Sequence, residues 1–139
     1  MTRLVAADIA CWVFRSAVAP ERLAPGWRPG AVVSMTRCVR PSYRLDLMAP
    51  GQRCLLWVSG RTDPGVHALG VLTETPREPD RSPVVPVDLT LLADPLPRAV
   101  LLADPAVRDA EVLRMPAGSN PSWLSASQFA AVLDRLGEG

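Results

Sequence analysis

The fifteen prolines of this 139-residue chain restrict its fold more than any other feature. Proline lacks a backbone N–H and breaks helices, so this density excludes a bundle of long helices. Most of the prolines lie between short apolar runs, where they end one segment before the next begins. The pattern predicts five or six short strands with few helices, an α+β chain in a single, partly open barrel with peripheral helices.

Alternation of apolar and polar residues indicates where the strands lie. We predict strands at 8–15, 31–37, 53–59, 65–74, 84–92 and 110–115, an irregular helical turn at 42–49 and a short helix at 97–104. Gly65 and Gly70 indicate a close backbone approach or a bend, as in a tightly curved sheet. Ser125 and Gln128 form a capping box that predicts a final helix, and Gly137 predicts its end.

Composition limits the class of protein. Hydrophobic residues make up 48% of the chain, so disorder is not expected, and the length suits one domain over residues 1–139. No stretch reaches the roughly 18 apolar residues of a membrane span. Asp8 interrupts the apolar start, unlike the uninterrupted stretch of a secretory signal. We therefore expect a cytoplasmic protein.

The three cysteines, Cys11, Cys38 and Cys54, lie in separate apolar runs, and the chain has one histidine. This spacing does not match a zinc site, so we expect neither a metal nor a cofactor. Small buried thiols in a reducing compartment are the simpler interpretation.

Charge is divided unevenly along the chain. Residues 1–61 hold nine arginines against three acidic residues, a balance of +6, whereas residues 62–139 have a balance of −5. Every basic residue is arginine, a side chain that can both pair with phosphate and stack on bases. Two interpretations stay open. The basic half meets an anionic partner, or the acidic half folds back over it.

Sequence motifs give little support to catalysis. The chain contains no GxSxG, P-loop or dinucleotide fingerprint, and His67 has no locally paired Cys or Ser. We therefore expect a protein that is not an enzyme. One alternative is a small hydrolase or nucleotide-processing enzyme with His67 as base. Another is a protein-interaction module that uses the acidic half.

Tryptophan is unusually frequent among the aromatic residues, with four Trp against two Phe and one Tyr. An indole ring offers a wide stacking face and one N–H donor, which suits a base-binding pocket. Trp57 and Ser59 are two residues apart in a strand, so they project to the same side. Trp12 fits a core position better, and Trp27, in a Pro/Gly loop, is either a lid or a plug. Trp123 fits packing at the start of the final helix.

Three segments together resemble the EVE domain of the PUA-like superfamily. Residues 51–60, GQRCLLWVSG, are similar to the family's Gly-Asp strand that ends in an aromatic residue, a spacer and Ser. Residues 65–73, GVHALGVLT, resemble the next strand, Gly-Ile-Tyr-Ala-Ile-Gly-x-Val. The third likeness runs from Val112 through the polar turn 118–122 to the capped helix. We interpret that turn as an ordinary connection rather than as a loop over a ligand.

The resemblance implies a small, mixed PUA-like β-barrel that binds RNA or DNA and captures a modified base in an aromatic-lined pocket, without catalysis. Trp57 would then stack on the base and Ser59 would bind its edge. The residues expected at the base are Trp57, Ser59, Trp12, Trp27, Ser34, Arg37 and Arg114, and those expected at the nucleic-acid backbone are Arg40, Arg44 and Arg61. Gln52 and His67 depart from the family pattern, which has Asp and Tyr at these places.

Overall fold

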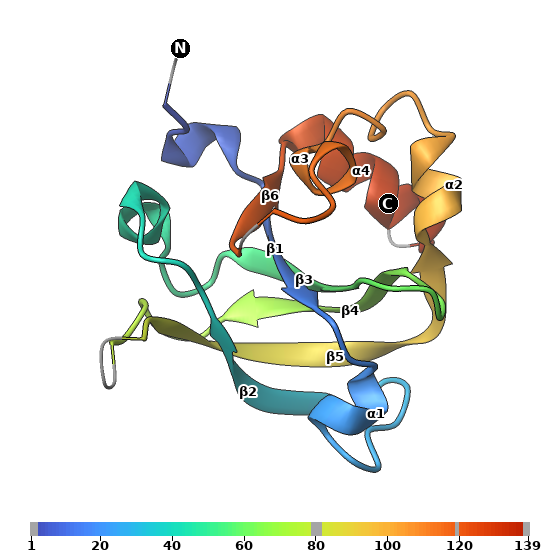
Figure 1. Cartoon of the computed structure of the whole chain (residues 1–139), viewed down its shortest axis with the longest axis horizontal. Helices are drawn as coiled ribbons and strands as arrows, with labels where there is room; N and C mark the ends of the chain where they lie inside the picture. The colour runs from blue at the N-terminus through green and yellow to red at the C-terminus, as the bar shows by residue number, and fades with distance from the viewer. Residues whose placement is uncertain (1–2, 79–81, 119, 138–139) are drawn as a thin grey trace.

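In the computed structural model, six strands form one mixed sheet that curls into an open barrel (Figure 1). The structure describes residues 3–78, 82–118 and 120–137. The strands are β1 (Cys11–Ser16), β2 (Val32–Cys38), β3 (Arg53–Val58), β4 (Gly65–Leu72), β5 (Val84–Pro97) and β6 (Ser122–Leu124), in the sheet order β2-β5-β4-β3-β1-β6. The expected α+β barrel is therefore confirmed.

The first strand lies inside the sheet rather than at its edge. Trp12 pairs with Cys54 of the parallel strand β3 on one side and with Trp123 of the antiparallel strand β6 on the other. All other strand pairs are antiparallel. A strand with neighbours on both edges and packing on both faces is apolar throughout. This explains why residues 11–14, CWVF, are all buried.

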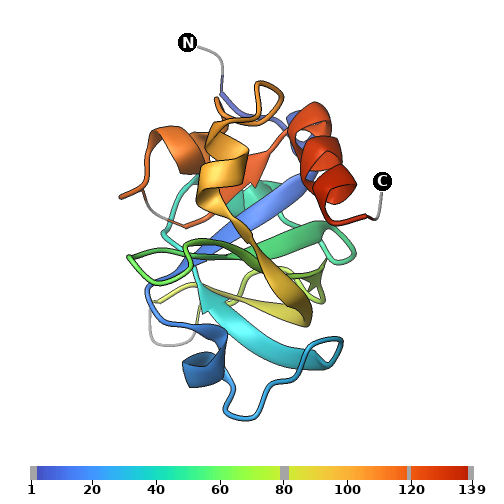
Figure 2. The same cartoon turned by 90° about the vertical axis from the view of Figure 1, so that its right-hand side faces the viewer.

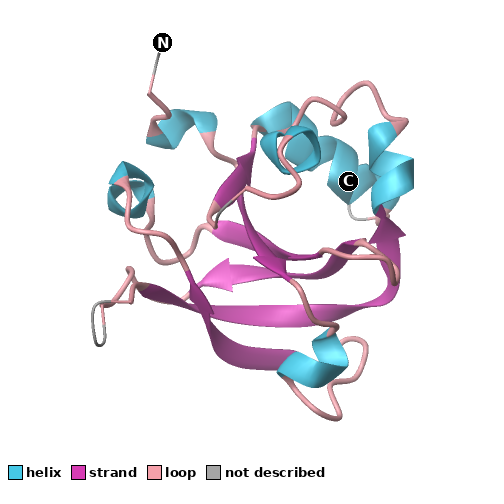
Figure 3. Cartoon of the chain, viewed as in Figure 1, coloured by secondary structure: helices cyan, strands magenta, loops and turns pink. Residues whose placement is uncertain are grey.

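The three C-terminal helices cover one face of the sheet, and the remaining short helices lie at its side and at its opposite end (Figure 3). The α-helices are α1 (Pro20–Leu23), α2 (Arg98–Leu102), α3 (Glu111–Arg114) and α4 (Ala126–Arg135), and the 3-10 helices are η1 (Ala6–Asp8) and η2 (Tyr43–Leu47). Figure 2 shows α2, α3 and α4 together above the sheet, with α1 at the opposite end. The three C-terminal helices pack on Val13, Leu55 and Trp57, whereas Trp12, Phe14 and Leu56 fill the concave side.

Two predicted elements differ from the structure, and one strand was not predicted. Residues 110–115 were predicted as a strand, but they contain α3, where Val112 and Leu113 are both buried. Two consecutive buried side chains suit a helical turn that packs on a sheet better than a half-buried strand, whose side chains alternate between its two faces. Strand β5 continues to Pro97, beyond the predicted end at 92. Strand β6 was not predicted, because three residues are too few to show alternation.

Local signals for the final helix and the curved strand are confirmed. The Ser125 hydroxyl accepts a hydrogen bond from the Gln128 amide at 3.3 Å, and the Gln128 side chain accepts from the Ser125 amide at 2.9 Å. Gly137 has φ +78° just after α4. A Cβ at Gly70 would lie 1.8 Å from the carbonyl oxygen of Asp88, so β4 and β5 touch there.

The cysteines divide into two kinds. Cys11 and Cys54 are buried, as expected, and burial raises the pKa of the Cys54 thiol to about 12. Cys38 is exposed instead, because it ends β2 at the edge of the sheet. Among the described residues, no His, Cys, Asp or Glu side chains gather as a metal site would require. No helix within this described part of the chain has the length and apolarity to cross a membrane.

Candidate functional site

Asn120 joins the two edges of the curled sheet. Its Oδ1 accepts a hydrogen bond from the Arg15 backbone N–H at 2.6 Å, and its Nδ2 donates to the Arg15 carbonyl at 3.1 Å. The side-chain amide thus replaces a peptide group and extends the pairing of β1 with β6, where Pro121 has no N–H to offer. The Asn120 carbonyl accepts from the Arg40 amide at 2.9 Å, which ties the segment after β2 to the same point.

A pocket of about 210 Å³ opens beside this seam. Its walls come from the segment after β2, from α3 and from the turn before β6. The lining residues are Arg40, Ser42, Arg44, Glu111, Met115, Gly118, Asn120 and Pro121. Sites for drug-sized ligands usually have about 300–1,000 Å³, so this pocket suits one small ring system.

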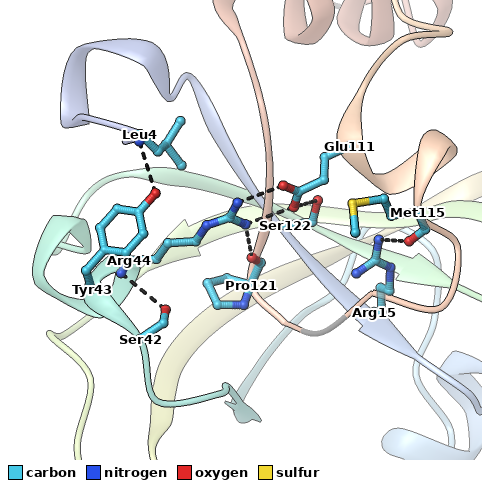
Figure 4. A network of polar contacts seen from close by, with 9 residues as sticks. All are labelled: Leu4, Arg15, Ser42, Tyr43, Arg44, Glu111, Met115, Pro121 and Ser122. Atoms are coloured by element: carbon cyan, nitrogen blue, oxygen red, sulfur yellow. Dashed lines mark hydrogen bonds and ion pairs between the residues drawn. The ribbon is translucent and has the colours of Figure 1, made fainter. Parts of the chain in front are cut away.

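Arg44 and Glu111 form a two-pronged ion pair across the pocket wall (Figure 4). Arg44 Nη1 donates to Glu111 Oε1 at 2.8 Å, and Nη2 donates to Oε2 at 2.7 Å. Arg44 also donates to the Pro121 carbonyl, and the Ser122 hydroxyl donates to Glu111 Oε1 at 2.9 Å. The bonds from Arg44 lower the pKa of Glu111 and raise the pKa of Arg44. Both groups are therefore charged at neutral pH.

Arg15 stands next to this pair, and Arg37 reaches the backbone of Arg15 from β2. Arg15 Nη2 donates to the Met115 carbonyl at 2.6 Å, and Arg37 Nη2 donates to the Arg15 carbonyl at 3.1 Å. Burial lowers the pKa of both guanidinium groups, but arginine stays protonated in proteins. Among the described lining residues Glu111 is the one acidic side chain, so the region carries an excess of positive charge.

The acidic half of the chain folds back over the basic half at one ion pair. Of the three ion pairs formed by described residues, Arg44–Glu111 joins the two halves. The other two, Arg77–Glu74 and Arg135–Asp104, lie within the acidic half. Among the described residues, direct pairing between the basic and the acidic half is therefore limited to this one contact.

The structure brings together some of the predicted arginines. Arg40 and Arg44 line the pocket, and Arg37 reaches the same seam through Arg15. Arg114 ends α3, directly before the lining residue Met115. Arg61 lies elsewhere, in the exposed connection between β3 and β4.

Ser34 and Ser59 also lie apart from the pocket. The Ser34 hydroxyl donates to the Asp88 carboxylate at 2.6 Å. Ser34 is exposed, whereas Val33 and Met35 on either side of it pack against the concave core, so Ser34 faces outward. The Ser59 amide donates to the Ser16 carbonyl and prolongs the pairing of β1 with β3.

The tryptophans that were expected to form the stacking wall are buried. The Trp57 ring is 4% exposed and packs under the helices, in register with Arg15 of β1. Trp12 is fully buried, and its Nε1 donates to Gln52 Oε1 at 2.7 Å. Trp27 is 7% exposed and bonds the Ala31 carbonyl, so it is a plug and not a lid. None of these three rings is among the lining residues of the pocket.

His67 has a structural position. Its ring is buried, and Nε2 lies 2.6 Å from the backbone carbonyl of Asp63. Asp63 has φ +45° in the tight connection between β3 and β4. The histidine thus holds this turn in place.

Sequence reasoning missed Asn120, Glu111, Arg15 and Met115. The polar turn 118–122 was the available signal for Asn120, and we interpreted it as an ordinary connection. Glu111 and Arg15 become neighbours of the pocket only after the two ends of the chain meet at β1 and β6. No local pattern in the sequence marks that meeting.

No family profile and no curated protein matches this chain. Solved structures do match it over nearly their whole length. A hypothetical protein from Leishmania major has a TM-score of 0.71 at 17% identity, covering 96% of this chain and 98% of that one. A protein from Pseudomonas syringae has a TM-score of 0.68 at 16% identity, covering 91% and 99%. Human THYN1 in complex with 5-methylcytosine-containing DNA has a TM-score of 0.62 at 16% identity, covering 93% and 98%. The chain therefore shares its fold with these proteins, in agreement with the fold that its sequence resemblance implied.

Proposed function

We propose that this chain binds nucleic acid at the seam pocket, where one modified base enters and the surrounding arginines hold the phosphate backbone. The observation that carries the proposal is that Arg40 and Arg44 line a pocket with a single carboxylate among its described lining residues, with the Arg15 guanidinium beside it at Gly118. Arginine contacts with phosphate supply most of the sequence-independent affinity of such proteins. A similar human protein has been solved with 5-methylcytosine-containing DNA, which supports the same partner on the same fold.

In this proposal the base packs on soft or planar groups other than tryptophan. Met115 is 54% exposed at the pocket wall, and its thioether packs well on aromatic rings. The Arg40 guanidinium offers a plane on which a base can stack. Trp57, in register with Arg15, supports that arginine from within the core, and Trp12 and Trp27 support the concave side.

The remaining predicted arginines have two roles in this proposal. Arg44, held by Glu111, keeps the pocket wall fixed. Arg114 and Arg61 lie further out and contact phosphates further along the nucleic-acid strand. The serines Ser34 and Ser59 have no role in the pocket in this proposal.

The proposed protein is a binding module without catalytic activity, in one domain over residues 1–139 and in the cytoplasm. The hydrolase alternative needs His67 as a free base. Because His67 is buried against the Asp63 carbonyl, the geometry gives that alternative no support. RNA and DNA are both compatible with the pocket, since a base edge and a phosphate are common to the two.

Titration with short single-stranded oligonucleotides tests the proposal. DNA and RNA probes with and without base modifications are titrated against the wild type, Arg40→Gln and Arg28→Gln at several salt concentrations. Arg28 is an exposed arginine in the loop after α1 and serves as the matched control. We expect Arg40→Gln to weaken binding several-fold and to reduce the slope of log affinity against log salt by about 0.7.

Arg28→Gln should leave both quantities close to the wild-type values. The proposal is wrong if no probe binds at low salt, or if the two variants lose affinity equally.

A further inference from the structure

Glu111 is the acidic residue of an otherwise basic wall. It stands at the start of α3 and lines the pocket, with its side chain 23% exposed. A carboxylate in a site that binds polyanions opposes the phosphate charge. We therefore look for a ligand group that donates a hydrogen bond to this carboxylate.

The hydrogen bonds of Glu111 leave room for one such contact. A carboxylate offers about four acceptor positions. Arg44 Nη1 and the Ser122 hydroxyl occupy two on Oε1, and Arg44 Nη2 occupies one on Oε2. The hydrogen bonds of the described residues thus leave one acceptor position on Oε2 of a side chain that lines the pocket. Because two bonds from one guanidinium fix the carboxylate plane, this acceptor is held in place before the ligand arrives.

Resting on the proposed function, we infer that Glu111 selects a base that presents an exocyclic amino group, as cytosine and adenine do, against a base with a carbonyl at that position. The amino groups N4 of cytosine and N6 of adenine are donors that match a carboxylate. Thymine and uracil place a carbonyl oxygen there, which a carboxylate repels. Guanine offers two neighbouring donors, N1 and N2, and one open acceptor satisfies half of them.

The hydrogen bonding of Glu111 keeps it an acceptor over the relevant pH range. Bonds from Arg44 lower the pKa of this carboxyl, so it carries no proton near neutral pH and cannot donate to a carbonyl. Arg40, another lining residue, supplies donors for the acceptor atoms that lie beside the amino group on cytosine and adenine. A donor from Arg40 beside the acceptor of Glu111 would match the ring nitrogen and the amino group at the edge of these two bases.

The test compares oligothymidylate with the same oligomer carrying one central cytosine, adenine or hypoxanthine. We expect the wild type to bind the cytosine or adenine probe about tenfold more tightly than the thymine and hypoxanthine probes. Glu111→Gln replaces one acceptor oxygen by an N–H donor, so this ratio should fall to about one or invert. Asp109→Asn is the matched control, because it removes the same charge from an exposed position two residues earlier.

Asp109→Asn should raise affinity for all four probes by one common factor and leave the ratio unchanged. Glu111→Gln removes the same charge, but it should favour the thymine and hypoxanthine probes relative to the cytosine and adenine probes, so only this variant changes the ratio. If Glu111→Gln does not fold, as thermal unfolding would show, Glu111→Asp takes its place and should lower the ratio by shortening the reach.

A wild type that binds all four probes equally overturns the inference and leaves the proposed function standing. A ratio that changes as much in Asp109→Asn also overturns it. Absence of binding to every probe overturns the proposed function together with the inference.

Discussion

At the scale of single residues, some side chains of this protein make hydrogen bonds that backbone groups make in an ordinary pair of strands. The Asn120 amide pairs with both backbone groups of Arg15, and the Glu111 carboxylate receives donors from η2 and β6. Each of these residues connects segments that are far apart in the chain. Substituting one of them therefore affects the stability of the fold and the shape of the pocket together.

We predict that Asn120→Ala lowers the free energy of unfolding by about 2–3 kcal/mol, because it leaves a donor and an acceptor of Arg15 without their partner. Urea unfolding measures this loss. Asn120→Asp is the informative comparison, since it keeps the oxygen that accepts from Arg15 N–H but cannot donate to the Arg15 carbonyl. Equal stability of Asn120→Ala and the wild type would contradict the role of this side chain as the seam.

Acid should weaken the fold through Glu111. The folded-state pKa of this carboxyl is depressed, first by the hydrogen bonds from Arg44, so the pair stabilises the protein above the unfolded-state pKa of about 4.3. That contribution disappears as the pH falls through the lower folded-state pKa. The Arg44 side chain does not titrate in this range, because its pKa is raised. Because the pair is partly exposed, the effect is modest.

Unfolding free energies measured between pH 7 and pH 2 check this expectation. The decline towards acid should be shallower for Glu111→Gln than for the wild type, and identical slopes would contradict it.

At the scale of elements, the features that depend on neighbours in the chain were the ones that the sequence predicted. Ser125 and Gln128 are three residues apart, and their reciprocal bonds need nothing beyond the first turn of α4. Gly70 indicates a close approach because a glycine inside an apolar strand usually makes space for a neighbouring backbone. The helix α3 was mistaken for a strand, because its four residues make about one turn, which is too short to show the 3.6-residue period of a helix.

The cap of α4 supports a direct prediction. Ser125→Ala removes the acceptor for the Gln128 amide and should cost about 1 kcal/mol of stability. Ser127→Ala, at an exposed position in the first turn, should stay within about 0.5 kcal/mol of the wild type. Thermal or urea unfolding of the two variants side by side distinguishes capping from a general effect of serine removal.

The contact between β4 and β5 predicts a much larger effect. Gly70→Ala would place a methyl group 1.8 Å from the Asp88 carbonyl oxygen, so the strands must separate. We expect a loss of several kcal/mol or an insoluble product. Gly51→Ala is the control, because its φ of +88° carries strain of about 1–2 kcal/mol while the space around it is open. Similar stabilities of the two variants would show that β4 and β5 do not touch.

At the scale of the whole molecule, the sequence predicted the curled sheet better than the pocket beside its seam. The charge imbalance between residues 1–61 and 62–139 left two interpretations open, an anionic partner or an acidic half folded over the basic half, and Arg37, Arg40 and Arg44 were named with the family resemblance. The pocket itself could not be predicted, because Glu111 and Asn120 belong to the acidic half and reach the arginines only through the closure of the sheet. The frequency of tryptophan suggested a stacking wall, but large rings are equally suited to filling a hydrophobic core. Trp12, Trp27 and Trp57 are buried in the two core clusters.

The central position of β1 has a consequence for the order of assembly. Strand β1 can pair with β3 early in synthesis, but its second neighbour, β6, is the last of the six described strands in chain order. Contacts between such distant segments form slowly, because the intervening chain must first lose much of its freedom. On the ribosome, residues 120–124 emerge after almost everything they bind. The pocket that they complete is therefore absent from the nascent chain until residues 120–124 have emerged.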